Sequence, residues 1–204
     1  MVTLDKVVCI NLKDRTDRRE SMTKELKKAG LLEAVEWLPG VSHMHGKVGF
    51  SQAQYNALFA CRDANHALVL EDDCVFTGHI ALDTVLSELP QSYDALWLGG
   101  NVRTQNNSKA TAHLWHCQNT WTTHAVLYSK KMIKWILENY KPPKYRIEYD
   151  IEIYDEWLRV EAQNKRECYI CKPFIAVQKE DYSDIEKRPT YYGALFHLSQ
   201  GRLR

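Results

Sequence analysis

Short apolar runs alternate with amphipathic stretches along most of the chain, and this alternation constrains the fold more than any other feature. The runs predict strands at residues 7–10, 36–40, 67–70, 94–98, 113–117, 123–128 and 169–177, the last interrupted at Pro173. Helical spacing predicts helices at 17–32, 51–65, 80–89, 129–139 and 151–161, with Ser51 and Ser129 as N-caps. This order predicts an α/β fold with helices flanking a mostly parallel central sheet.

One predicted strand runs directly into three consecutive acids, in the stretch Leu68–Phe76 that reads LVLEDDCVF. Adjacent carboxylates repel one another, and desolvating them at the end of a buried strand is costly. A divalent cation would supply the missing positive charge, and Glu71, Asp72 and Asp73 are candidates to hold one. The alternative is a solvated turn between two strands.

Other polar residues and glycines follow predicted strands in the same way. Asn11 follows the first strand, and Gly99 and Gly100 follow the strand at 94–98. In parallel sheets, ligands bind outside the carboxyl ends of the strands. We therefore expect these residues and the three acids to meet in one crevice.

The bulk composition argues against several classes of partner. The chain has 204 residues, enough for one domain, and a formal net charge of +1. So small a charge gives no reason to expect binding to nucleic acid. We expect no signal peptide, because Met1 leads into a strand-like run, with no basic start followed by a long apolar core. We expect no transmembrane helix, because no stretch approaches about 18 uninterrupted apolar residues. We expect a cytoplasmic protein, peripheral to a membrane where its acceptor is lipid-linked.

The six cysteines are scattered and mostly lie in apolar segments. This pattern predicts buried free thiols rather than a disulfide framework. Cys168 and Cys171 form a C-x-x-C pair, but a structural zinc site needs a second pair at suitable spacing.

Seven blocks of the sequence together resemble family 25 of the glycosyltransferases, which includes lipopolysaccharide-biosynthesis enzymes and collagen hydroxylysine galactosyltransferases. The blocks are VCINLKDRTDRRESM at Val8–Met22, GKVGF at Gly46–Phe50, LVLEDDCVF at Leu68–Phe76, YDALWLGG at Tyr93–Gly100, HAVLYSKKMIKWI at His124–Ile136, EYDIEIY at Glu148–Tyr154 and QKEDYSDI at Gln178–Ile185. The resemblance implies a single GT-A-like domain over residues 1–204, with a nucleotide-binding half at about 1–100 and an acceptor half at about 101–204.

The resemblance also implies a metal-dependent hexosyltransferase that inverts anomeric configuration. The donor would be UDP-galactose, with UDP-glucose as an alternative, and the acceptor a hydroxyl of a glycan or hydroxylated peptide. By analogy, Asp73 and then Asp72 would hold Mn²⁺ or Mg²⁺, and Glu71 would act through water or the ribose. His197 is a candidate third ligand, against the alternative of a packed core histidine. The sequence does not predict an oligomeric state.

The first block would form the nucleotide pocket, with Asn11, Arg15 and Arg18 as donor-binding residues together with Gly99 at its strand end. The alternative for the arginines is a set of exposed ion pairs with Asp14 and Asp17 at the start of a helix.

A base must deprotonate the incoming hydroxyl, and EYDIEIY offers Asp150 first and Glu152 second. The alternative is that these acids begin a helix. The sequence departs from the family at Gln54, where a histidine is expected. A second hypothesis for the whole chain is a catalytically silent, glycosyltransferase-like binding domain. A third, an unrelated metal-dependent nucleotidyltransferase or hydrolase, lacks a supporting G-x-G-x-x-G or P-loop motif.

Overall fold

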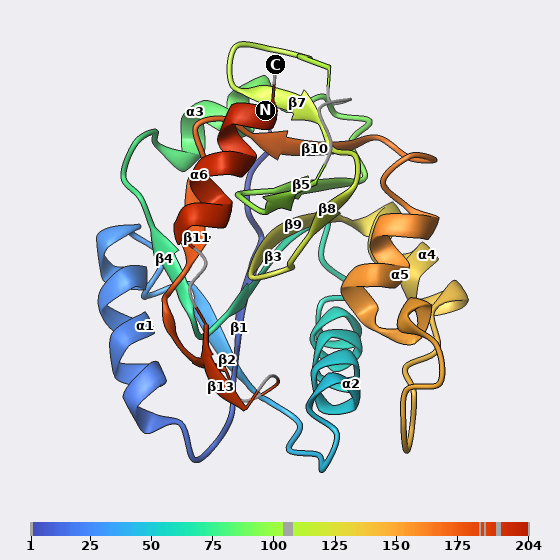
Figure 1. Cartoon of the computed structure of the whole chain (residues 1–204). Coiled ribbons are helices and arrows are strands. Elements are labelled where there is room, and N and C mark those ends of the chain that lie inside the picture. The colour runs from blue at the N-terminus through green and yellow to red at the C-terminus, as the bar shows by residue number, and fades with distance from the viewer. Residues whose placement is uncertain (1, 104–107, 184, 186, 191–192, 204) are drawn as a thin grey trace.

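A computed structural model describes residues 2–103, 108–183, 185, 187–190 and 193–203. Seven strands form one sheet in the order β2-β1-β3-β9-β5-β10-β7 (Figure 1). Their bounds are β1 Lys6–Asn11, β2 Val35–Pro39, β3 His66–Glu71, β5 Ala95–Trp97, β7 Leu114–His116, β9 Ala125–Ser129 and β10 Cys168–Cys171.

The sheet is mostly parallel, which confirms the predicted α/β class. β1 pairs in parallel with β2 and β3, and β5 pairs in parallel with β10. β9 runs antiparallel between β3 and β5, and β7 runs antiparallel at one edge. The sequence pattern does not reveal these two reversals, because a strand buried on both faces is a continuous apolar run in either direction.

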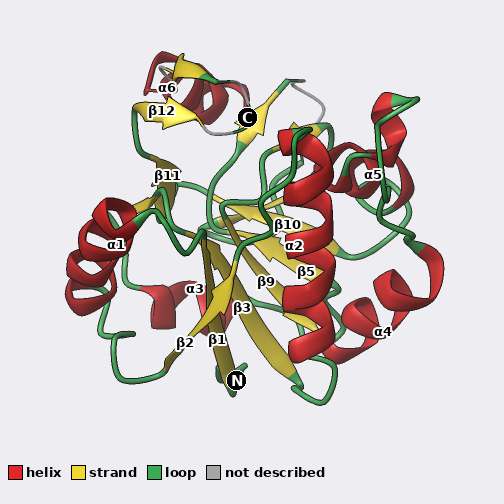
Figure 2. Ribbon diagram, turned by 90° about the horizontal axis from the view of Figure 1, so that it is seen from below, coloured by secondary structure: helices red, strands yellow, loops and turns green. Residues whose placement is uncertain are grey.

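Helices cover both faces of the sheet (Figure 2). Their bounds are α1 Thr16–Lys28, α2 Gly46–Ala60, α3 Leu82–Glu88, α4 Lys130–Asn139, α5 Tyr154–Glu161 and α6 Gly193–Arg202, with a 3₁₀ turn η1 at Asp150–Glu152. Residues of α1 and α3 pack into one apolar core, and residues of α2, α4 and α5 pack into another. Successive residues of β1 enter alternate cores, since Val7 belongs to the first and Val8 to the second.

Three short ribbons complete the described structure. β4 (Cys74–Phe76) pairs with β11 (Ala176–Gln178), β6 (Asn101–Val102) with β8 (Thr120–Trp121), and β12 (Asp181–Ser183) with β13 (Arg188–Thr190). β11 is the continuation of the predicted 169–177 strand after the interruption at Pro173.

The predicted N-cap at Ser129 is confirmed and the one at Ser51 is wrong. α1 ends before Gly30, which adopts the left-handed φ of +69°, and Ser129 Oγ caps α4 by accepting from Met132 N at 3.3 Å. Ser51 does not cap a helix, because α2 already begins at Gly46. Instead Ser51 is buried, and its Oγ accepts a hydrogen bond from Tyr154 N at 3.2 Å. A serine can therefore begin a helix or join two helices, and spacing alone does not distinguish these roles.

The six cysteines are free and buried, as predicted. Within the described part of the chain, no helix has the length and apolar character needed to cross a bilayer.

Candidate functional site

The three-acid stretch is a turn whose side chains are largely shielded from solvent. β3 ends at Glu71, Asp72 and Asp73 form the turn, and β4 begins at Cys74. The side chains of Asp72 and Asp73 are only 9% and 14% exposed. The alternative, a solvated turn between two strands, is therefore correct for the backbone conformation. It is wrong about exposure, because the turn is largely shielded from solvent. Carboxylates this shielded need partners.

Arg18 and Asn11 supply partners for Asp72. Arg18 NH1 lies 2.9 Å from Asp72 Oδ1 and 4.0 Å from Asp73 Oδ2. Asn11 Nδ2 donates to Asp72 Oδ2 at 2.7 Å and to the Arg15 carbonyl at 3.1 Å. The structure thus brings together the first block and the acids, as predicted. Arg15 itself pairs with Asp17 at 2.9 Å, which is the helix-start ion pair given above as the alternative.

The other two acids have weaker compensation, since Arg18 NH1 is 4.0 Å from Asp73 and no ion pair is recorded for Glu71 among the described residues. Glu71 Oε1 accepts from Gln54 Nε2 at 2.9 Å and from Thr123 Oγ1 at 3.0 Å. Asp73 Oδ2 accepts from Gln178 Nε2 at 3.3 Å. Burial raises the pKa of Asp73 to about 6, and burial together with the charge of Asp73 raises the pKa of Glu71 well above its usual range. One guanidinium therefore does not neutralise the whole cluster.

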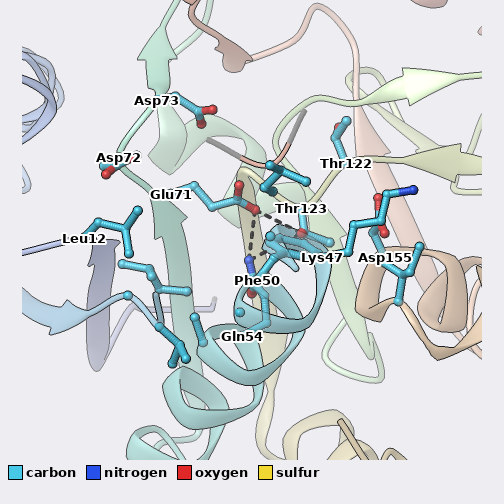
Figure 3. A pocket seen from close by; sticks show the side chains of 18 of the residues that line it. Leu12, Lys47, Phe50, Gln54, Glu71, Asp72, Asp73, Thr122, Thr123 and Asp155 are labelled. Carbon is cyan, nitrogen blue, oxygen red and sulfur yellow. Dashed lines mark hydrogen bonds between the residues drawn. The ribbon is translucent and has the colours of Figure 1, made fainter. Parts of the chain in front are cut away.

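The acids line one wall of a cleft of about 510 Å³. Figure 3 shows Asp72, Asp73 and Glu71 on this wall, Gln54 and Thr123 next to Glu71, and Thr122 and Asp155 on the far side. Further lining residues come from the ends of β1, β2 and β11, from α1, α2, α5 and β13, and from the loops next to them: Ile10, Leu12, Arg18, Gly40, Val41, Ser42, His43, Gly46, Lys47, Gly49, Phe50, Ala53, Ile153, Glu156, Gln178, Lys179, Ile185 and Thr190. Residues far apart in the chain thus form one site at the carboxyl ends of β1 and β3.

Lys47 is a cation of the cleft that the sequence did not single out. It lies in the first turn of α2, its side chain is exposed, and no ion pair is recorded for it among the described residues. Both its charge and the positive end of the helix dipole favour an anion at this position.

Asp155 is the second acid of the far wall. Its carboxylate accepts from Glu156 N at 3.0 Å, and burial followed by the charge of Glu156 raises its pKa. Glu156 lines the cleft as well, but it is engaged by Arg159 at 2.8 Å and by the indole of Trp121. Asp155 is therefore the acid of this wall that is better placed to exchange a proton with a ligand.

A divalent cation, where one binds, would lie at the Asp73 end of the cleft. Asp73 Oδ1 is buried and has no hydrogen-bond partner in the described structure, and carboxylate oxygens are the ligands that Mn²⁺ and Mg²⁺ prefer. Both oxygens of Asp72 are already engaged by Asn11 and Arg18. Among the described residues, no three His, Cys, Asp or Glu side chains converge as metal ligands. Asp73 would thus be the main protein ligand, with Asp72 holding Arg18 in place.

Six predicted site residues lie outside the cleft lining, namely Asn11, Arg15, Gly99, Asp150, Glu152 and His197. Asp150 is exposed in η1, and Glu152 folds back so that its carboxylate accepts from Glu148 N at 2.8 Å. This turn places both acids at the start of a helix, which is the alternative given for them above. His197 is exposed on α6 and does not line the cleft, so it does not complete a ligand set with Asp73.

Gly99 has a packing role instead of a binding one. A Cβ at this position would lie 2.0 Å from the carbonyl oxygen of Ala176 in β11. Glycine here lets β11 approach the end of β5, and Gly99 does not line the cleft.

Sequence reasoning missed Asp155 and Lys47 as site residues, and it assigned no role to Gln54. Lys47 lies within the quoted GKVGF block, so the block carried a signal that was not used. Asp155 lies five positions after Asp150, and only the break between η1 and α5 at Ile153 turns one acid outward and the other into the cleft.

No family model matches this sequence, and no curated protein matches it. A solved structure of a glycosyltransferase involved in glycosylation of the major capsid of PBCV-1 is 9% identical, with 96% of this chain and 98% of that chain covered and a TM-score of 0.47. A197 from STIV is 12% identical, with 92% and 99% covered and a TM-score of 0.45. None of these likenesses shows a family. The membership of family 25 stays a prediction, and the function has to be argued from the cleft.

Proposed function

We propose that the cleft binds a nucleoside diphosphate sugar and transfers its sugar to a hydroxyl acceptor. The observation that carries this proposal is the arrangement of charges across one cleft. Arg18 and the acid turn lie on one wall, Lys47 lies at a helix N-terminus, and the carboxylate of Asp155 lies on the far wall. A glycosyl transfer needs this separation, because the diphosphate leaves on one side of the sugar and the hydroxyl attacks from the other.

Each charged group has a role in this scheme. Arg18 and Lys47 would bind the diphosphate oxygens and stabilise the charge that develops on the leaving group. Mn²⁺ or Mg²⁺ held by Asp73 would add Lewis-acid stabilisation of the same phosphates. Asp155 would accept the proton of the attacking hydroxyl while the new glycosidic bond forms and the bond to the diphosphate breaks. Direct displacement of this kind inverts the anomeric configuration.

The identity of the substrates is a finer part of the proposal. The resemblance to family 25 favours UDP-galactose as the donor, with UDP-glucose as the alternative. It favours a glycan, such as the core of lipopolysaccharide, or a hydroxylated peptide as the acceptor. A catalytically silent domain that only binds nucleotide is the competing function.

Thermal denaturation with UDP, UDP-galactose and UDP-glucose, each with and without Mn²⁺, tests the proposal. A ligand at about 100 times its Kd stabilises the native state by about 2.7 kcal/mol, so its true donor should raise Tm by several degrees. The shift should be larger with Mn²⁺, and Asp73→Asn should remove the metal-dependent part. Asp83→Asn on the exposed surface of α3 is the matched control.

Two results would contradict parts of the proposal. Stabilisation by UDP alone, with no transfer to any hydroxyl acceptor, would favour the silent binding domain. The absence of a shift with all three nucleotides would remove both functions.

A further inference from the structure

Besides atoms at the acid turn, Asp73 Oδ1 and Gln178 Oε1 among them, two further buried side-chain atoms of the cleft wall have no recorded hydrogen-bond partner in the described structure. They are Gln54 Oε1 and Thr122 Oγ1, and both residues line the cleft. Gln54 is only 1% exposed, so solvent does not satisfy its amide oxygen. Unpaired buried polar atoms are uncommon in folded proteins, and at a cleft wall they point to a ligand that carries hydrogen-bonding groups.

The orientation of the Gln54 amide is set by its other end. Gln54 Nε2 donates to Glu71 Oε1 at 2.9 Å and lies 3.4 Å from Thr123 Oγ1. With the nitrogen engaged by a carboxylate, Gln54 Oε1 is left as an acceptor. Its complement is a donor such as a hydroxyl group.

Thr122 is held in an unusual backbone conformation. Its φ is +77°, which a β-branched residue rarely adopts, and its carbonyl accepts a hydrogen bond from Trp97 Nε1 at 3.1 Å. Backbone strain of this kind persists only where surrounding contacts enforce it, and it concentrates at ligand sites. Thr122 is adjacent to Thr123, which bonds Glu71, and its backbone amide donates a hydrogen bond to Asp155 on the far wall.

The two residues line opposite sides of the interval between the acid turn and Asp155. In Figure 3, Gln54 lies next to Glu71 on the wall of the acids, and Thr122 lies with Asp155 on the far side. The transferred sugar must occupy this interval, because the leaving diphosphate and the base have to lie on opposite sides of its anomeric carbon.

We infer that Gln54 and Thr122 form a subsite for the hydroxyl groups of the transferred hexose. Gln54 Oε1 accepts a hydrogen bond from one sugar hydroxyl. Thr122 Oγ1 donates a hydrogen bond to a second sugar hydroxyl or accepts one from it. The inference rests on the proposed function and adds specificity residues to it. Because the subsite contacts the sugar alone, it contributes to the affinity for a nucleotide sugar and leaves the affinity for UDP unchanged.

Calorimetric Kd values for UDP, UDP-galactose and UDP-glucose, measured with Mn²⁺, test the subsite. Thr122→Ala and Gln54→Met should each raise the Kd of the bound sugar nucleotide about tenfold, the scale of one lost hydrogen bond, and change the Kd of UDP less than about twofold. Thr122→Ser keeps the hydroxyl and should restore wild-type affinity. Thr84→Ala, at an exposed position on α3, is the matched control.

The outcomes separate the subsite from the function on which it rests. If wild-type protein binds UDP and a sugar nucleotide, and the variants weaken both equally or neither, the subsite is overturned and the proposed function stands. Wild-type protein that binds UDP and neither sugar nucleotide also contradicts the subsite. If wild-type protein binds none of the three, the proposed function itself fails. The two Thr122 variants decide the question even where Gln54→Met does not fold.

Discussion

At the scale of single residues, the site depends on which acids have a partner. Asp72 is neutralised by Arg18, whereas Asp73 and Glu71 keep raised pKa values because burial disfavours their charged forms. Across the cleft, Asp155 is half-buried and Glu156 is engaged by Arg159. The three acids therefore suit different roles. Asp72 holds Arg18 in place, Asp73 is suited to a metal ion, and Asp155 is suited to proton transfer.

The assignment of the base is tested by replacing the carboxylate of a single aspartate with the carboxamide of asparagine. Asp155→Asn should lower kcat by about 10²- to 10⁴-fold, because the acceptor hydroxyl loses its base, and should leave the Kd of the donor nearly unchanged. Asp150→Asn is the matched control, since Asp150 is exposed and outside the cleft. Steady-state kinetics with a hydroxyl acceptor measures the first effect and calorimetry the second. A large loss of turnover in Asp150→Asn alone would return the role to the residue favoured by the sequence.

At the scale of elements, β11 links the sheet to the site. The amides of Ile175 and Ala176 donate to the carbonyl of Leu98 at 2.8 and 3.1 Å, so β11 begins against the end of β5. Gln178 at the end of β11 then reaches Asp73. The packing of a glycine thus determines where a cleft residue lies.

Gly99→Ala should destabilise the fold. The new Cβ would lie 2.0 Å from the Ala176 carbonyl oxygen, and backbone atoms have little freedom to move aside. Overpacking of this kind costs about 1–3 kcal/mol, which urea denaturation measures as a lower midpoint. Gly201→Ala in α6 is the matched control, because a Cβ there meets nothing within 4 Å and alanine favours a helix. Equal stability of the two variants would contradict the close approach of β11.

At the scale of the whole molecule, the sheet separates two apolar cores and holds the cleft at one end. The lining runs from Ile10 to Thr190, so the cleft draws on both the nucleotide-binding half and the acceptor half expected from the sequence. That division into halves stays a prediction. Because the cleft is assembled from so much of the chain, its geometry depends on the fold of the whole molecule. Conditions that unfold the protein should abolish ligand binding as well.

His124 makes this stability depend on pH. It is fully buried, donates from Nε2 to the Ala176 carbonyl at 3.3 Å, and burial lowers its pKa from 6.5 to about 4. A depressed folded-state pKa means that the neutral form is favoured in the native state. Its contribution is present above pH 6.5 and is lost as the pH falls towards 4.

As the pH falls from 6.5 to about 4, the free energy of unfolding of the wild-type protein should decrease more than that of His124→Asn. The difference should be on the order of 3 kcal/mol. Urea denaturation at a series of pH values measures the difference between the two slopes, and the other titrating groups are common to both proteins. His197→Asn, on the exposed face of α6, controls for the loss of a histidine. Parallel slopes for wild type and His124→Asn would show that His124 is charged in the native state.

The sequence by itself determined the α/β class, most of the strands, and the meeting of Asn11 and Arg18 with the acid turn. These features follow from local periodicity and from the rule that parallel strands end at the same edge of a sheet. The tertiary structure alone decided the direction of β9, the burial of the turn, and the placement of Asp155 but not Asp150 in the cleft lining. The physical reason is that exposure and partners depend on contacts between distant segments. Asp150 and Asp155 have the same side chain and lie five positions apart in the sequence. Only the packing of η1 and α5 leaves one exposed and places the other in the cleft wall.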